Sequence, residues 1–270
     1  MFSFFRKKKI IPHIKLSGVI GNVGKFKQGI DFSGQEEIIS KAFALKKAPC
    51  VAITINSPGG SPVQSHLIHN FIRQQAKKNK KKVIVFAEDV AASGGYLIAC
   101  AGDEIYANAS SIIGSIGVIY SSFGFTELIK KIGVERRIFT AGENKSFLDP
   151  FLKVNKKDEI KLKDLQKKIH QNFINWVSSR RGKKIKEKDF KKIFSGTFWL
   201  SEDAKSLGLI DGISSESTFF KKKFGEKVKI KKIKQPKSLK QKLGLGISSY
   251  SAEELVSKAK EELMFNKYGL

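Results

Sequence analysis

The stretch Val83-Ile84-Val85-Phe86, followed shortly by Ala91-Ala92-Ser93-Gly94-Gly95-Tyr96, decides how this chain folds. The first four residues are β-branched or apolar and predict a strand, which we expect Glu88-Asp89 to end. The run from Ser93 to Cys100 is small and apolar, as at the start of a buried helix. Ser93 is therefore expected where a strand turns into a helix. The free N–H groups of the first helical turn would point toward whatever Ser93 Oγ attacks.

A second glycine-rich turn follows another predicted strand. Residues 51–55 are apolar and β-branched, and they run into Asn56-Ser57-Pro58-Gly59-Gly60. Further strands are predicted at residues 14–20, 104–107, 116–120, 134–140 and 228–233, and helices at 36–45, 63–72, 125–132, 158–177 and 186–194. This alternation indicates an α/β fold with parallel strands, whose ligands meet the loops at the carboxyl ends of the strands.

Together the two turns can supply a nucleophile and an oxyanion hole. Backbone N–H groups of Gly59-Gly60 would lie beside the Ser93 oxygen if both turns share one edge of the sheet. An isolated Ala-Ser-Gly-Gly sequence, however, is more often an ordinary turn in which the serine caps the helix. Both interpretations stay open on these residues alone.

The strong positive charge does not indicate a nucleic-acid partner. The formal net charge is +26, but only six of the 51 basic residues are arginine, and the lysines are spread over every predicted helix. Nucleic-acid readers depend on arginine forks and stacked aromatic rings. We expect most lysines to be solvated and no nucleic acid to bind. Cys50 and Cys100 lie in apolar runs without metal-ligand spacing, so we expect reduced, buried thiols and no metal or cofactor.

A serine nucleophile needs a base, and the histidines do not supply one. No cluster of carboxylates accompanies any of the four, so we expect surface or packing roles for His13, His66, His69 and His170. A lysine can replace histidine if burial lowers its pKa. Lys145 is notable because its loop has few other charges and large apolar residues follow it, among them Phe147 and Leu148. Composition alone does not select it among so many lysines.

Four motifs occur in order: Asn56-Ser57-Pro58-Gly59-Gly60, Ala91-Ala92-Ser93-Gly94-Gly95-Tyr96, Gly114-Ser115-Ile116-Gly117-Val118 and Gly142-Glu143-Asn144-Lys145-Ser146, with Gly208-Leu209-Ile210-Asp211 downstream. Over about residues 10–235 they closely resemble the signal peptide peptidase A family of serine peptidases, peptidase family S49. The resemblance implies a Clp-protease and crotonase-like fold of repeated strand-strand-helix units. It also implies a Ser–Lys dyad in which Ser93 is the nucleophile and Lys145 the general base.

The remaining site residues follow from the same resemblance. Ser115 matches the family's serine that orients the lysine, and Gly60 and Gly94 match the backbone of the oxyanion hole. Members of the family hydrolyse remnant signal peptides and other hydrophobic polypeptides without a metal. The alternative class is a crotonase-like acyl-CoA enzyme, which would share the fold and the oxyanion hole but move protons with carboxylates.

Two features depart from the family pattern. Many relatives carry an N-terminal membrane anchor, whereas here a short apolar run precedes the basic cluster, so we expect a soluble, cytoplasmic protein. The same Phe/Lys segment is a candidate for peripheral contact with the anionic inner membrane of a bacterium. Glu143 lies two residues from Lys145, and its carboxylate must point away if Lys145 is to act as a base.

We expect four parts: an N-terminal basic segment (1–12), the peptidase domain (13–235), a Lys/Gly linker (236–250) and a C-terminal helix (251–270). The last helix is amphipathic, so it either docks on a partner or forms a loosely packed tail. The loop at 140–155 lacks any helical or strand period and carries large apolar residues. We predict that it packs against a second subunit in a homo-oligomeric ring, so that Lys145 reaches the Ser93 of a neighbour rather than that of its own chain.

Overall fold

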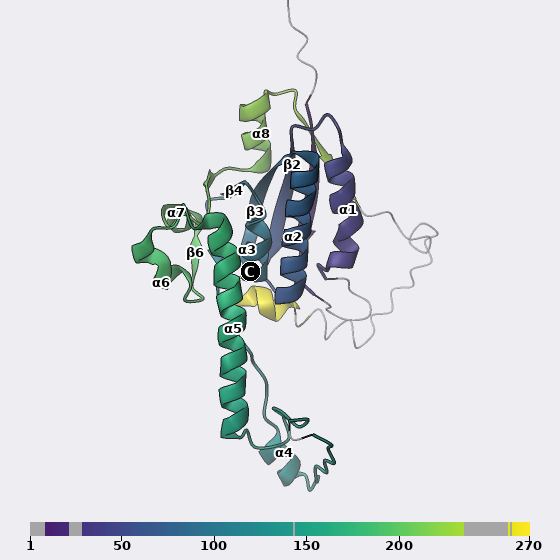
Figure 1. Ribbon diagram of the computed structural model, residues 1–270, viewed down its shortest axis with the longest axis vertical. Helices are drawn as coiled ribbons and strands as arrows, with labels where there is room; N and C mark the ends of the chain where they lie inside the picture. Colours follow the sequence, from purple (N-terminus) through teal and green to yellow (C-terminus); the bar gives the residue numbers. More distant parts are fainter. Residues whose placement is uncertain (1–8, 22–28, 143, 235–258, 260) are drawn as a thin grey trace, which may run out of the picture.

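The computed structural model describes residues 9–21, 29–142, 144–234, 259 and 261–270 (Figure 1). Their helices and strands are, in chain order, β1 (Ile10–Ser17), α1 (Phe32–Ala44), β2 (Cys50–Ser57), α2 (Pro62–Asn79), β3 (Lys82–Ala92), α3 (Gly94–Ala99), β4 (Glu104–Ala107), β5 (Ile112–Gly114), α4 (Thr126–Lys131), α5 (Lys156–Arg181), the 3₁₀ turn η1 (Glu187–Asp189), α6 (Phe190–Ile193), β6 (Phe198–Leu200), α7 (Ser201–Ser206), β7 (Gly212–Ile213), α8 (Glu216–Phe224) and β8 (Lys229–Lys232).

Within the described residues, one eight-stranded sheet forms the centre of the fold. Six strands follow the order β6-β5-β3-β2-β1-β8. Strand β4 lies outside this order and pairs with both β3 and β7. Every pair is parallel except β5 with β6. Strand β3 changes neighbour along its length, since residues 84–87 pair with β4 and residues 90–92 with β5. The carboxyl ends of β2 and β3 lie side by side, which brings the two glycine-rich turns to the same edge.

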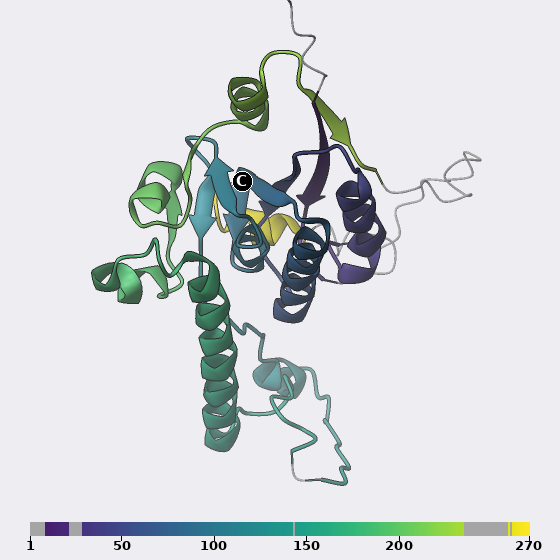
Figure 2. The same cartoon turned by 45° about the horizontal axis from the view of Figure 1, so that its top comes forward.

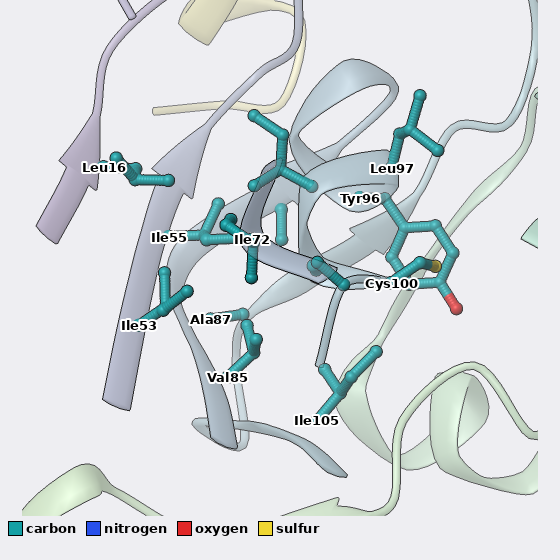
Figure 3. Packing of buried hydrophobic residues seen from close by; sticks show 14 of the residues in the cluster. Leu16, Ile53, Ile55, Ile72, Val85, Ala87, Tyr96, Leu97, Cys100 and Ile105 are labelled. Atoms are coloured by element: carbon teal, nitrogen blue, oxygen red, sulfur yellow. The ribbon is translucent and has the colours of Figure 1, made fainter. Parts of the chain in front are cut away.

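Helices cover both faces of this sheet (Figures 1 and 2). Ile53 and Ile55 of β2 and Val85 of β3 pack toward Ile72 of α2 and Tyr96 of α3 (Figure 3). All five side chains are fully buried, and burying each one contributes about 1.5–3 kcal/mol. A mixed α/β fold with a central sheet is therefore confirmed.

Helix α8 covers the opposite face. Phe220 is fully buried there, with its ring 5.5 Å from the ring of Phe86 on β3. The sequence analysis did not anticipate this helix. Its three consecutive lysines hide the apolar period that Phe220 and Phe224 carry.

One predicted strand boundary and two predicted strands are wrong. Strand β3 does not end at Glu88-Asp89 but continues to Ala92. The pairing of β2 with β3 is irregular at this point, and the Asn56 side chain bridges it. Asn56 accepts a hydrogen bond from the Val90 N–H at 3.2 Å and donates one to the Asp89 carboxylate at 2.7 Å. No strand forms at residues 116–120, because the short strand β5 ends before Ser115. Residues 134–140 are not a strand either, since all but Ile138 are exposed and no strand of the described residues pairs with them.

The described residues of the segment 119–155, which we call the arm, extend away from the sheet and lie near the N-terminal half of α5 (Figures 1 and 2). Helix α4 lies within it and buries none of its residues. Helix α5 spans 26 residues, about 39 Å, yet its buried residues are Phe173, Val177 and Arg181, all in the half nearest the sheet.

The two ends of the domain differ partly from expectation. Strand β1 begins at Ile10, so the sheet takes in the last residues of the predicted N-terminal segment 1–12. Strand β8 is a basic edge strand, as predicted, and it pairs with β1. The linker at 236–250 and the first residues of the C-terminal helix lie outside the described residues. Residues 261–266 are helical. Among the described helices, none combines the length and the apolar character needed to cross a membrane.

Candidate active site

Ser93 lies at the turn from β3 into α3, as predicted. Its backbone has φ 51° and ψ −123°, a conformation that residues other than glycine rarely adopt. The turn is held from both sides, because the Ser93 N–H donates to the Gly114 carbonyl at 2.8 Å and the Ser93 carbonyl accepts from the Leu97 N–H at 3.0 Å. The Ser93 side chain makes no capping hydrogen bond, so the helix-cap interpretation is wrong. A strained turn of this kind presents Oγ to a substrate.

The two glycine-rich turns lie against each other. A Cβ atom at Gly59 would come within 2.7 Å of Ser93 Cβ, and one at Gly60 would come within 2.0 Å of the Ile20 carbonyl oxygen. Only glycine fits at these two positions. The described part of the chain offers no hydrogen-bond partner to the Gly60 N–H, and Gly94 opens α3, where N–H groups lack a partner within the helix. Both N–H groups are thus available to a substrate oxygen.

A cleft of about 660 Å³ opens beside Ser93, and Gly60, Gly94 and Ser115 also line it. Its apolar side chains come from α3, α5, the segment after Ser115 and the C-terminal helix: Leu97, Ile169, Phe173, Val118, Ile119, Leu263 and Met264. Trp176 of α5 stacks on His66 of α2, with ring centroids 3.8 Å apart, and this contact joins the two helices at the cleft. The cleft therefore suits an apolar chain more than a charged one.

Ser115 is held rigidly at the wall of this cleft. Its side chain is 5% exposed, its φ is 53°, and its N–H donates to the Thr197 carbonyl at 2.8 Å. The Tyr268 hydroxyl donates to Ser115 Oγ at 3.3 Å. The structure thus brings together Ser93, Ser115, Gly60 and Gly94, four of the five predicted site residues.

Lys145, the fifth, lies elsewhere. It is exposed on the arm, where its N–H donates to the Gly142 carbonyl at 3.2 Å. Nearby, the Leu148 N–H donates to Asp158 at the start of α5, whereas His170 farther along α5 lines the cleft. The helix rises about 18 Å between Asp158 and His170. Lys145 is accordingly remote from the Ser93 of its own chain, and its role as base stays a prediction. Glu143 lies outside the described residues.

Three residues lie at the cleft where the sequence analysis did not place them, and one of these, His170, was expected to have a surface or packing role. His170 lies with Nε2 3.2 Å from the Ile116 carbonyl oxygen. Lys267 is the one lysine among the described residues that line the cleft, and Tyr268 follows it. The amphipathic pattern of the C-terminal helix was the signal that could have found the last two. It indicated a docking face but not the surface that receives it.

The other histidines and the cysteines have packing roles, as predicted. His69 is buried with Nδ1 2.9 Å from the Leu97 carbonyl oxygen, and burial lowers its pKa to about 4. Cys50 and Cys100 are free and buried. Burial raises their pKa values to about 11 and about 12, so neither thiol is reactive near neutral pH. Within the described ranges, no group of three or more His, Cys, Asp or Glu side chains could hold a metal ion.

Comparison with known proteins agrees with this geometry. A family model described as Peptidase family S49 matches residues 75–230, more than half of the chain. The "Probable protease SohB" of Haemophilus influenzae is 32% identical over 216 residues, covering 78% of this chain and 58% of that protein. The "Serine protease SPPA, chloroplastic" of Arabidopsis thaliana is 30% identical over 205 residues, covering 73% of this chain and 30% of that protein.

A further relative carries a name of another kind. The "Na(+)/H(+) antiporter NhaA" of Brucella abortus is 48% identical over an alignment of 273 positions, which covers 96% of this chain but 37% of that protein. Its name therefore describes a chain of which the matched segment is a minor part. The present chain spans between about a third and three fifths of the relatives named here. With the family model matched across the sheet and the Ser93 turn, this chain belongs to peptidase family S49.

Proposed function

We propose that this protein is a serine endopeptidase that hydrolyses peptide bonds in signal-peptide remnants or other short or unfolded hydrophobic polypeptides. The observation that carries the proposal is the uncapped Ser93 hydroxyl, held on a strained turn beside the free N–H groups of Gly60 and Gly94. A turn of this kind serves acyl transfer, because the nucleophile and the oxyanion donors are fixed before the substrate arrives. We also propose that the α/β fold is of the Clp-protease and crotonase-like type, built from repeated strand-strand-helix units.

The reaction would proceed by transfer of an acyl group to Ser93. A neutral lysine amine takes the Ser93 Oγ proton while Oγ attacks the carbonyl carbon of the peptide. The developing oxyanion accepts hydrogen bonds from Gly60 and Gly94, and the lysine then returns the proton to the leaving amine. The same amine then takes a proton from water as the water oxygen attacks the acyl carbon, and the resulting ammonium gives that proton to Ser93 Oγ as the bond between Oγ and the acyl carbon breaks.

We propose that the lysine is Lys145 of a neighbouring subunit. The exposed position of Lys145 on the arm and its distance from the Ser93 of its own chain support this arrangement. The arm also carries large apolar side chains that are more than half exposed: Ile119, Phe123, Leu128, Ile132, Val134, Phe139 and Val154. Contact with a second copy in a ring would bury them and would carry Lys145 toward the next subunit's cleft.

A serine-reactive probe tests the nucleophile. A fluorophosphonate should label the wild-type protein, and Ser93→Ala should abolish labelling. The matched control is Ser195→Ala, since Ser195 also lines the cleft but bonds to its own neighbours Lys192 and Thr197. Labelling that persists in Ser93→Ala would remove the proposal.

Mixing two inactive variants tests the origin of the lysine. Co-assembly of equal amounts of Ser93→Ala and Lys145→Ala should restore about a quarter of wild-type activity. In a ring, a site is complete only where an intact serine meets an intact lysine, which random mixing gives at about one interface in four. Mixed oligomers that form but stay inactive would show that the dyad lies within one chain.

Lys267 is the rival base, because it lines the cleft of its own chain. Lys267→Ala should keep most of its activity, whereas Lys145→Ala should lose it; the reverse result would assign the base to Lys267. The acyl-CoA alternative draws no support from the comparisons, since the relatives that match at the Ser93 turn include named proteases.

A further inference from the structure

The last residues of the chain lie at the cleft, although they fall outside the segment that matches the family. Tyr268 is 8% exposed and packs on Val90 and Ala92 of β3, behind the Ser93 turn. Its ring meets the ring of Phe198 on β6 edge-on, with centroids 5.1 Å apart. Figure 1 shows the C-terminal helix, in yellow, at the carboxyl ends of the strands near α3. The tail is thus part of the site's structure rather than a loose end.

One polar contact joins this tail to the predicted catalytic machinery. The Tyr268 hydroxyl donates to Ser115 Oγ at 3.3 Å in surroundings where both side chains are buried. A serine hydroxyl has one O–H to donate and two acceptor positions. The Tyr268 hydroxyl occupies one acceptor position of Ser115 Oγ. The second acceptor position and the O–H of Ser115 are left for the lysine. An incoming lysine amine would then meet a hydroxyl with fewer open orientations, because one of its acceptor positions is already occupied.

We propose that Tyr268 is a positioning residue of the active site, which holds Ser115 so that Ser115 orients the lysine base. The inference rests on the proposed function and deepens it, because it adds a residue from the C-terminal helix to the Ser93–Lys145–Ser115 arrangement. Tyr268 lines the cleft, and its hydroxyl bonds Ser115 rather than Ser93. Its effect passes through one hydrogen bond to Ser115.

The surroundings of Tyr268 favour a hydroxyl that stays protonated. Burial is the largest cause and raises the pKa of Tyr268 above its usual value, while the hydrogen bond with Ser115 opposes that shift. Lys267 Nζ lies 5.6 Å from the centroid of the Tyr268 ring. The hydroxyl therefore remains a donor to Ser115 over the range in which a lysine base would work.

The test is Tyr268→Phe, which removes one oxygen and keeps the ring that packs on β3. We expect kcat to fall about five- to tenfold, because one hydrogen bond that aligns the base is lost, while KM changes less than twofold. The alkaline rise of the rate against pH should shift, since the lysine is held less firmly. The thermal midpoint should stay within about 2 °C of wild type. Tyr106→Phe is the matched control, because that hydroxyl bonds Glu104 away from the cleft, and it should leave kcat unchanged.

A double variant distinguishes positioning from packing. Ser115→Ala with Tyr268→Phe should be no slower than Ser115→Ala alone, because Tyr268 acts only through Ser115. Three results would each overturn the proposal. The losses of kcat in the two single variants could add up in the double variant, or Tyr268→Phe could leave kcat unchanged. Tyr268→Phe could also lower the thermal midpoint while kcat stays normal. Fluorophosphonate labelling distinguishes failure of the proposed function from failure of the positioning role. If the probe does not label Ser93 in the wild-type protein, the proposed function fails. If the probe labels Ser93 in the Tyr268→Phe variant as fast as in the wild type, only the positioning role fails.

Discussion

The Ser93 turn and the arm that carries Lys145 are stabilised in opposite ways. Around Ser93 the neighbouring backbone and side chains are buried, and glycines fit where no other residue would. The arm has little interior: α4 buries none of its residues, Phe139 is 93% exposed, and Arg136 pairs with Asp149 at the surface. One region is complete within a single chain, whereas the other leaves apolar surface uncovered. In the proposed arrangement, the fold of one chain would preorganise Ser93, and assembly with a second chain would bring in Lys145.

Removing the nucleophile should give the largest effect and should leave the fold intact. Ser93→Ala takes away one oxygen at the turn, so we expect kcat for a peptide or ester substrate to fall by about 10⁶. The thermal midpoint should match that of wild type within about 2 °C, measured by calorimetry. More than a tenth of the wild-type rate in Ser93→Ala would refute the nucleophile assignment.

Substitution on the arm should cost as much activity without touching the sheet. Lys145→Arg should be as inactive as Lys145→Ala, because a guanidinium does not lose its proton at any working pH. Lys153→Arg, also on the arm, is the control and should keep its activity. Rates measured from pH 6 to 10 should rise on the alkaline side in wild type, since an ammonium must lose its proton before it can act as a base. An active Lys145→Arg enzyme would assign the base to another group.

Replacing one glycine by alanine near the Ser93 turn and one on the arm should show how differently the two regions are packed. Gly60→Ala would place a Cβ atom against the Ile20 carbonyl oxygen. We therefore expect the free energy of unfolding to fall by about 3 kcal/mol and the activity to be lost. Gly124→Ala on the arm meets nothing within 4 Å and should change that free energy by less than about 0.5 kcal/mol. Denaturant titration of both variants measures the contrast. Equal losses would mean that the arm is as tightly packed as the turn.

The last effect concerns a partly buried carboxyl, that of Glu216 at the start of α8. Glu216 Oε1 lies 3.7 Å from His13 Nε2, but burial raises the pKa of Glu216 to about 7 and lowers that of His13 to about 4. The two groups are therefore not charged together to any great extent, and the contact is not an ion pair. Because the folded pKa of Glu216 exceeds its usual 4.5, its contribution to stability is complete below about pH 4.5 and is lost as pH rises through about 7.

Glu216→Gln removes this titration. The variant should gain about 1 to 3 kcal/mol in the free energy of unfolding relative to wild type between pH 5 and pH 8. The same substitution at Glu159, on the exposed half of α5, should alter the pH dependence much less. Urea unfolding at the two pH values measures both. A pH-independent difference between Glu216→Gln and wild type would mean that Glu216 is not buried in the folded state.

Much of the sheet and its turns could be predicted from local sequence. Apolar β-branched runs followed by glycines marked β2 and β3, and their parallel arrangement placed Gly60 beside Ser93. These features depend on neighbouring residues in the chain. The predicted strand at residues 116–120 failed because a strand also needs a neighbour to pair with, and Ser115 in a left-handed conformation ends β5 just before it.

The docking of the C-terminal helix could not be predicted in the same way. Tyr268 meets Ser115 across 153 positions of sequence, and no local pattern encodes such a contact. The position of Lys145 raises the same difficulty between chains. Its motif identified the residue through the family resemblance, while in the proposed ring the surface that receives the arm would belong to another copy.

The pairing of β1 with β8 has a consequence for the synthesis of the protein. Strand β1 can join β2 early, but its other edge pairs with β8, which leaves the ribosome about 200 residues later. At ordinary rates of translation that edge waits roughly 10 to 40 s, exposed to other nascent chains. Pro12, which has no N–H, and the charged Lys15 lie on β1 and make it a poor template for a stray strand. A chain stalled before Lys229 would keep this edge open, so we expect premature termination to yield aggregates rather than a smaller folded domain.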